Sequence, residues 1–150
     1  MRDRINDALK IATKARQERR MNTLRLIKAA IKDRDIDARG EGREAVTDAE
    51  ILSIMQKMVR QREESAQIYD GAGRKELGDQ EREEIGIIQE FLPQSLSEAE
   101  VLAAIDAAIA ETGAKGLRDM GKVVNALKTK HPGRIDLGAA SKTVKAKLGA

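Results

Sequence analysis

The sequence predicts an all-α protein, and three observations lead to that fold class. Apolar residues recur at intervals of three and four along almost the whole chain of 150 residues, which is the helical period. No segment alternates apolar and polar residues with the period of two that a half-buried strand shows. Aromatic residues make up only 1% of the chain, so the core must be aliphatic, and Leu, Met and Ala are strong helix formers.

The first two predicted helices are joined by a turn that we expect at residues 19–22. A loop is expected at residues 39–46, where two glycines interrupt the apolar pattern. The helical spacing is carried by Ile5, Leu9, Ala12 and Arg16 in the first helix and by Met21, Leu24, Ile27 and Ile31 in the second.

The third predicted helix begins at Thr47, because Thr47 and Glu50 form the sequence of a capping box. Residues 70–73, with two glycines, end it. A fourth helix follows and is expected to end at Pro93, which cannot continue a helix. The apolar positions are Ile51, Met55, Met58, Ala66 and Tyr69 in the third helix and Leu77, Ile85, Ile88 and Leu92 in the fourth.

Three shorter helices are predicted in the remaining third of the chain. A second capping box, Ser97 with Glu100, opens the fifth helix, and Gly113 ends it. Pro132 separates the sixth helix from the seventh, which Asp136 can cap. Their apolar positions are Val101, Leu102, Ile105 and Ile109, then Leu117, Met120, Val123, Val124 and Leu127, then Leu137, Ala140, Val144 and Leu148.

The pattern predicts two domains, an N-terminal four-helix domain of residues 1–93 and a C-terminal three-helix domain of residues 94–150. Charge is uneven along the chain: residues 1–44 carry net +5 and residues 45–95 carry net −5. The acidic centre can therefore neutralise the basic N-terminal helices within the fold. Residues 115–150 carry nine Lys or Arg and only two Asp, a net charge of +7.

Composition excludes most catalytic and metal chemistries. The chain has no Cys and one histidine, His131, so thiolate chemistry is excluded and any triad or multi-His metal site lacks partners. Residues 116–123 nearly spell a phosphate-binding loop, but Val123 replaces the required Ser or Thr. The acidic cluster Glu81, Glu83 and Glu84 is interpreted as a solvated face or as partners of the basic first helices. We therefore expect a non-catalytic protein without cofactor or metal.

Targeting signals are not evident. No apolar run approaches the ~18 residues that a membrane helix needs. The first residues are charged and amphipathic, unlike a secretory signal, and Asp3 and Asp7 argue against a transit peptide. We expect a cytoplasmic protein.

The basic C-terminal third indicates either a surface for nucleic acid or simply a solvated, Lys-rich helix face. Pairs such as Lys142 and Lys145, three residues apart, can share one helix face and contact phosphates. No aromatic residue lies in this region, so base stacking is disfavoured and shape and phosphate contacts would carry the binding. The candidate RNA-binding residues are Arg118, Lys122, Lys128, Lys130, Arg134, Lys142 and Lys145.

Several short motifs follow one another along the chain. They lie at residues 61–65 (Gln-Arg-Glu-Glu-Ser), 73–77 (Gly-Arg-Lys-Glu-Leu), 81–85 (Glu-Arg-Glu-Glu-Ile), 91–94 (Phe-Leu-Pro-Gln), 119–123 (Asp-Met-Gly-Lys-Val), 133–136 (Gly-Arg-Ile-Asp) and 144–145 (Val-Lys). In this order they resemble the YqeY family, whose sequence is similar to the C-terminal part of the GatB subunit of glutamine-dependent tRNA amidotransferases. Phe91 replaces a Tyr that is usual in the family, and Val124 replaces a common Met.

The resemblance implies a helical N-terminal domain, a three-helix C-terminal domain and a link to the transamidation of misacylated tRNA. In the amidotransferase the similar region binds tRNA, while the catalytic parts lie on other domains and subunits. We therefore expect a stand-alone, non-catalytic module that binds tRNA or tRNA-like RNA through its C-terminal domain. The first alternative is a module that docks an aminoacyl-tRNA synthetase or an amidotransferase through the acidic middle or the basic N-terminal helices. An enzyme is the third class that stays open.

Overall fold

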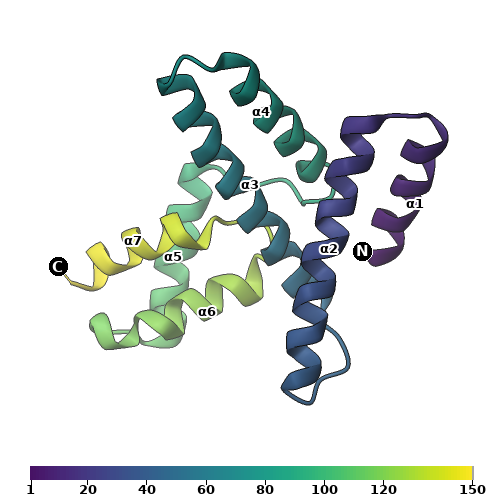
Figure 1. Cartoon of the computed structure of the whole chain (residues 1–150). Coiled ribbons are helices and arrows are strands. Elements are labelled where there is room, and N and C mark those ends of the chain that lie inside the picture. The colour runs from purple at the N-terminus through teal and green to yellow at the C-terminus, as the bar shows by residue number, and fades with distance from the viewer. Residues whose placement is uncertain (150) are drawn as a thin grey trace. The chain divides into compact units, whose positions relative to one another are not determined.

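The structure, a computed structural model, describes residues 1–149, which form helices joined by turns and loops (Figure 1). These residues contain no strand, which confirms the all-α prediction. The helices are α1 (Arg2–Lys14), α2 (Glu18–Gly40), α3 (Asp48–Gly71), α4 (Lys75–Gln89), α5 (Glu98–Thr112), α6 (Met120–Lys130) and α7 (Leu137–Leu148), and a short 3-10 helix, η1 (Leu117–Asp119), precedes α6.

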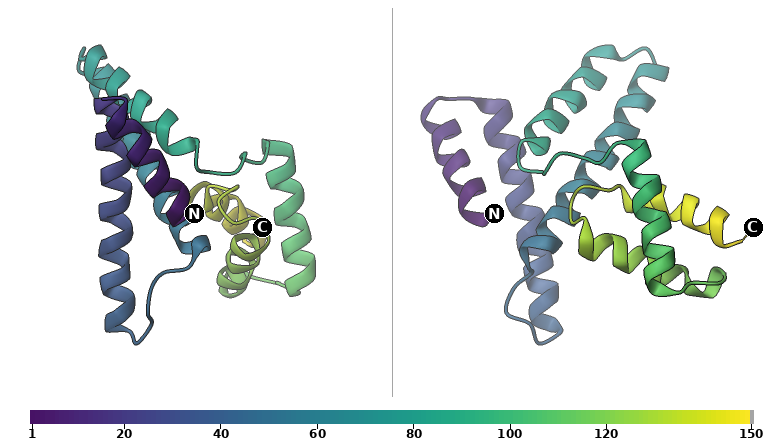
Figure 2. Two further views of the ribbon diagram at one scale, coloured as in Figure 1. Left: turned by 90° about the vertical axis from the view of Figure 1, so that its right-hand side faces the viewer. Right: turned by 180° about the vertical axis from the view of Figure 1, so that it is seen from behind.

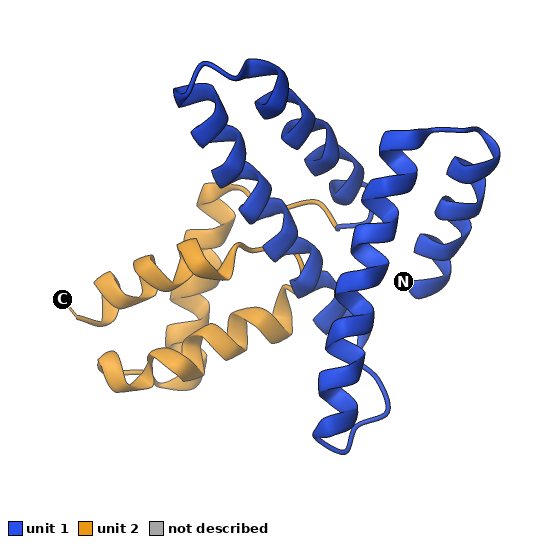
Figure 3. Cartoon of the chain, viewed as in Figure 1, with its two compact units in different colours: residues 1–92 blue, residues 93–150 orange. Residues whose placement is uncertain are grey.

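The chain divides into two compact units (Figure 3). Unit 1 comprises Met1–Leu92 and contains α1 to α4, and unit 2 comprises Pro93–Ala150 and contains α5 to α7. Each unit has its own cluster of buried apolar side chains. Burial of apolar surface, which is the main stabilising term in folding, is thus provided separately in each unit.

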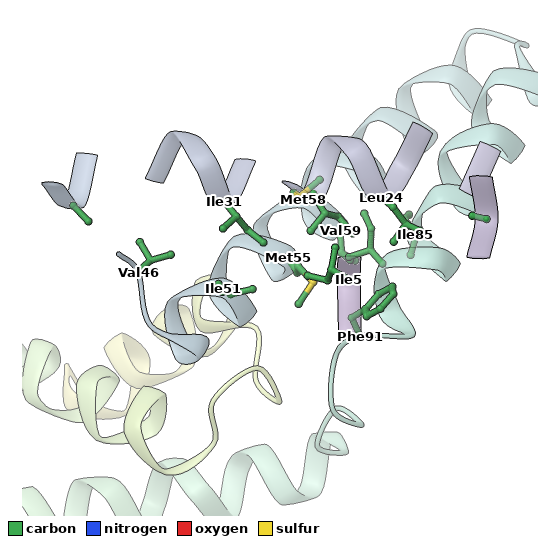
Figure 4. Close-up of a cluster of buried hydrophobic side chains, with 14 residues drawn as sticks. Ile5, Leu24, Ile31, Val46, Ile51, Met55, Met58, Val59, Ile85 and Phe91 are labelled. Carbon is green, nitrogen blue, oxygen red and sulfur yellow. The ribbon is translucent and has the colours of Figure 1, made fainter. Parts of the chain in front are cut away.

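Unit 1 consists of two helical hairpins that share one aliphatic core. α1 packs along α2, α3 packs along α4, and α2 also contacts α3 and α4 (Figure 2). Figure 4 shows the core where the four helices converge. Its fully buried large side chains are Ile5 from α1, Leu24 and Ile27 from α2, Ile51 and Met55 from α3, and Ile88 from α4.

The first turn lies earlier than the sequence predicts. Residues 19–22 are part of α2, and the chain reverses at residues 15–17 instead. Arg16 adopts a positive φ of 55°, a conformation more usual for Gly or Asn, and the N–H of Gln17 donates to the carbonyl of Ala12. These contacts end α1 without the glycine or proline that a sequence search depends on.

A buried carboxylate joins three segments of unit 1. Asp35 of α2 accepts two hydrogen bonds from the guanidinium of Arg2, at 2.8 and 2.7 Å. It also accepts one from the backbone N–H of Val46, at 2.9 Å. The pKa of Asp35 is held well below its usual range by the Arg2 bonds and then by the Val46 bond, against the opposing effect of burial. The start of α1, the second half of α2 and the loop before α3 are thereby tied together.

The acidic centre pairs with bases of the N-terminal half, as one interpretation of the sequence predicts. Glu83 accepts from Arg19 at 3.1 Å, and Glu90 pairs with Arg20. Both bases lie in the first turn of α2, where the chain passes α4. Glu84 accepts instead from the half-buried Arg62 of α3, at 3.0 Å.

The hairpin of α3 and α4 depends on a glycine at its closest approach. A Cβ atom on Gly78 would lie 2.5 Å from the Asp70 carboxylate and 3.3 Å from the carbonyl oxygen of Ala66. The Asp70 carboxylate accepts two bonds from Arg82, at 2.9 and 3.0 Å, and would have to leave them to make room for a Cβ. The packing of α3 on α4 at this point therefore favours a residue without a side chain.

We expect Gly78→Ala to lower the melting temperature by several degrees, although Ala is the better helix former by roughly 1 kcal/mol. Gly86→Ala is the matched control, because a Cβ there meets no atom within 4 Å and α4 continues on both sides. That variant should gain the helix propensity and melt slightly higher. Thermal unfolding followed by circular dichroism measures both, and an equal rise in the two variants would contradict the close approach.

Unit 2 packs α5 and α7 on α6 around a small core. Its most buried large side chains are Ile105, Val123, Leu127 and Val144. The predicted caps are present: Ser97 and Glu100 form both bonds of a capping box, and Asp136 accepts from the N–H groups of Gly138 and Ala139. Gly113 ends α5 with a positive φ of 65°.

The first capping box is only half formed. The Thr47 hydroxyl accepts from the N–H of Glu50 at 3.2 Å, so α3 begins where the sequence predicts. The Glu50 carboxylate does not reach back to the N-cap. Instead it accepts from Arg43 in the preceding loop, at 2.6 Å, and that ion pair is the main reason why the pKa of Glu50 is lowered.

Candidate nucleic-acid interface

The clearest exposed basic face of unit 2 lies on α7. Lys142 and Lys145 are exposed and three residues apart, while Ala140 and Val144 on the opposite side of the helix are buried. Neither lysine takes part in an ion pair within the described residues. The two ammonium groups therefore share one face and are available to an external anion.

The predicted bases before and within α6 point in more than one direction. Arg118 lies in η1, which leads directly into α6, whereas Lys122 lies in the first turn of α6 itself. The side chain of Lys122 is 70% exposed, and its ammonium lies 3.8 Å from the Asp119 carboxylate. Lys128 is exposed without an ion pair among the described residues. Because Lys122 and Lys128 are six residues apart, they lie on different sides of the exposed half of α6.

Asp119 organises the turn that carries Arg118. Its carboxylate accepts from the backbone N–H of Lys115 at 3.0 Å. This bond is the main cause of the lowered pKa of Asp119, and Lys122 and Arg118 lower it further. Asp119 thus fixes the backbone of this turn, and its negative charge offsets part of the positive charge of Arg118 and Lys122.

Two bases of unit 2 are neutralised by α5. Lys130 pairs with Glu111, and Lys147 pairs with Asp106. Both acids lie on α5, while the bases lie near the ends of α6 and α7. Of the predicted RNA-binding residues, Lys130 therefore has an internal partner, as does Lys147, which lies outside that set.

Arg134 has a positional role in unit 2. Its Nε donates to the carbonyl oxygen of Gln94 at 2.9 Å, and its own carbonyl accepts from the N–H of Leu96 at 2.9 Å. These two bonds attach the segment before α5 to the loop between α6 and α7. Half-buried Arg134 is thus committed to the fold, and its contact with RNA stays a prediction.

Sequence reasoning missed a set of exposed bases on α2. Arg25, Lys28 and Lys32 are exposed, and within the described residues none of them makes an ion pair. Arg39 continues the same side of the helix seven residues after Lys32. The signal was present in the spacing, but the net charge of residues 1–44 suggested internal neutralisation, which holds only for the bases nearer α4.

The described residues contain no group of three or more His, Asp or Glu side chains placed to hold a metal ion. His131 is half-buried at the C-terminal end of α6, where its backbone N–H donates to the carbonyl of Leu127. Within the described part of the chain, no helix is long and apolar enough to cross a membrane.

Fold and charge together define the class of this chain: a small all-helical protein of two compact units, with exposed bases on a three-helix C-terminal unit. It belongs to the family described as Yqey-like protein, whose family model matches residues 2–148. The chain is also 25% identical, over 150 residues, to "Altered inheritance of mitochondria protein 41, mitochondrial" from Pyrenophora tritici-repentis (strain Pt-1C-BFP). That match covers 98% of this chain and 80% of the relative.

Proposed function

We propose that this protein is a non-catalytic module that binds tRNA or tRNA-like RNA through unit 2. The observation that carries the proposal is the exposed face of α7, where Lys142 and Lys145 have no carboxylate partner among residues 1–149. Arg118 and Lys128 add exposed positive charge in the same unit. Resemblance to the tRNA-binding part of a glutamine-dependent tRNA amidotransferase supports RNA over other polyanions, and it connects the protein with that system of carbon–nitrogen ligases.

The mode of binding follows from the chemistry of the exposed groups. Both aromatic residues of the chain, Tyr69 and Phe91, precede unit 2, so unit 2 offers no aromatic platform for stacked bases. Lysine ammonium groups bind phosphates as point charges and read no base edge. The protein would therefore recognise the shape and backbone of a folded RNA, with an affinity that falls steeply as salt rises.

The test replaces Lys142 and Lys145 together by Gln and measures binding to total tRNA by fluorescence anisotropy across a salt series. Each neutralised phosphate contributes about 0.7 to 0.9 to the slope of log affinity against log salt. The double variant should bind all tRNAs more weakly and flatten that slope by roughly 1.5 to 2 units. Its helicity and melting temperature should scarcely change, because exposed lysines contribute little to stability.

Lys130→Gln with Lys147→Gln is the matched control. It removes the same charge from the same unit, but from bases that already pair with Glu111 and Asp106. The control should retain most of the salt slope. Unchanged RNA binding by the Lys142 and Lys145 variant would contradict the proposal. Equal losses of RNA affinity in both variants would also contradict it, because they would show that the net charge of unit 2, and not one face of α7, determines binding.

We also propose that the two units are separate folding domains and that the protein works in the cytoplasm. Separate hydrophobic cores support the first statement. The relative's name places that protein in mitochondria, so the location stays a prediction that fractionation of the native cell would test.

A further inference from the structure

The outward face of α2 carries a regular seam of exposed residues. They follow one another at intervals of three and four, the spacing with which one helix packs along another in a coiled coil. Every one of them is exposed, although the opposite side of the same helix is buried in the core of unit 1. This α2 seam consists of Asn22, Arg25, Ala29, Lys32, Ile36 and Arg39.

The α2 seam alternates between two kinds of side chain. Arg25, Lys32 and Arg39 occupy one set of positions, seven residues apart. Asn22, Ala29 and Ile36 occupy the other set at the same interval, and Ile36 is 53% exposed. A row of solvated lysines needs no apolar residue. The combination of bases with an exposed isoleucine, at the intervals of helix packing, therefore indicates a surface for a partner helix.

The bases of the seam also differ from the other bases of α2. Arg19 and Arg20 point toward α4 and pair with Glu83 and Glu90. Arg25 and Lys32 make no ion pair within the described residues. Arg39 donates to the carbonyl of Glu44 at 3.4 Å, and its charge helps to lower the pKa of Asp35. The inner bases of α2 thus pair with carboxylates of unit 1, whereas Arg25 and Lys32 of the seam have no such partner among the described residues.

We propose that the α2 seam is a docking surface for an acidic amphipathic helix of a partner protein. A partner helix with carboxylates opposite Arg25, Lys32 and Arg39 and apolar residues opposite Ala29 and Ile36 would match both its charge and its spacing. An RNA backbone would use the bases but would gain nothing from Ile36. The seam spans about 26 Å of helix, which corresponds to five turns of the partner. This inference is independent of RNA binding by unit 2.

The probe is a fluorescein-labelled synthetic helix of about 21 residues, with Glu opposite the three bases and Leu opposite Ala29 and Ile36. A scrambled peptide of identical composition loses the spacing and keeps the charge. Titration of the full chain at physiological salt should show binding of the first peptide, with a gain of helical circular dichroism, and at least about tenfold weaker binding of the scrambled one.

Two single substitutions on α2 locate the contact. Lys32→Glu should weaken binding of the acidic peptide about tenfold or more, since it places like charges opposite each other. Arg34→Glu is the matched control: it makes the same charge change at an exposed position on another side of α2, and should change affinity by less than about twofold. Ile36→Ser should weaken binding without changing its salt dependence.

Three results would overturn the proposal. Equal affinity for the designed and the scrambled peptide would show that binding depends on the net charge of the peptide and not on its spacing. Displacement of the peptide by tRNA, with loss of tRNA binding in Lys32→Glu, would assign the face to RNA. A dimer in sedimentation that Lys32→Glu abolishes would assign it to a second copy of this chain.

Discussion

Asp35→Ala should lower the melting temperature by roughly 10 °C, the largest effect that we expect from removing a polar group of unit 1. The substitution leaves the buried N–H of Val46 without its acceptor, and it leaves the partly exposed guanidinium of Arg2 with only its bond to the Val46 carbonyl. A polar group that loses its partner away from water costs much more than the loss of an exposed ion pair. Thermal unfolding of the purified chain measures the shift.

Glu83→Ala is the control for this prediction. Glu83 also pairs with an arginine, Arg19, but the side chain of Glu83 is 60% exposed. Its removal should therefore scarcely change the melting temperature. Asp35→Asn separates charge from hydrogen bonding, because the amide keeps the shape and loses the negative charge. Equal melting of the Asp35→Ala and Glu83→Ala variants would show that the buried carboxylate is dispensable.

The same carboxylate predicts a pH dependence of stability. Because the pKa of Asp35 is lowered by folding, its charged form stabilises the native state at pH values above the ordinary pKa of about 3.9. This contribution decreases as the pH falls below that value toward the folded pKa. The melting difference between the parent and Asp35→Ala should therefore be constant from pH 7 to about 5 and narrow below about 4. A constant difference down to pH 3 would contradict it.

Core truncations should destabilise each unit separately. Ile27→Ala in unit 1 and Leu127→Ala in unit 2 each remove a fully buried side chain and should cost about 3 kcal/mol. Among residues 93–149, the core of unit 2 has seven buried apolar residues, so this loss should unfold a large fraction of the unit at moderate temperature. Hydrogen exchange read by mass spectrometry should show lost protection confined to residues 93–149 in Leu127→Ala.

Leu102→Ala is the control for removing a leucine from unit 2. Leu102 is 46% exposed, so this substitution should scarcely change the free energy of unfolding. The separate-domain proposal depends on where protection is lost. If Leu127→Ala reduces protection equally in α2 and in α6, the chain folds as one cooperative unit.

The predictable part of the fold is the part that sequence periodicity encodes. The apolar spacing located every α-helix, because each helix buries one side against a neighbour. The turn at Arg16 was not predictable, since it has neither Gly nor Pro and depends on a positive φ that a residue such as arginine rarely adopts. The half-formed cap at Thr47 was missed for a similar reason, because Arg43 competes for the carboxylate of Glu50.

The candidate site shows the same limit. Exposure of Lys142 and Lys145 follows from the helical period, and the sequence was sufficient for it. The partners of Lys147 and Arg134 lie 41 and 40 residues away along the chain, so no local pattern could reveal which bases are already neutralised or committed to the fold. The α2 seam, in contrast, could have been found from spacing alone, and only an overall charge sum concealed it.

The core of unit 1 brings together the first helix of the chain and the turn at the end of unit 1. Ile5 and Phe91 lie in one buried cluster, and the guanidinium of Arg4 stands 5.4 Å from the centre of the Phe91 ring. During synthesis on a ribosome, α1 and α2 can therefore pair early, but their apolar faces stay open until Phe91 has left the exit tunnel. Unit 2 has its own core, so it can fold once residues 93–149 have emerged, without waiting for unit 1. A chaperone that binds exposed aliphatic surface would thus meet this chain in the interval before residue 91 emerges.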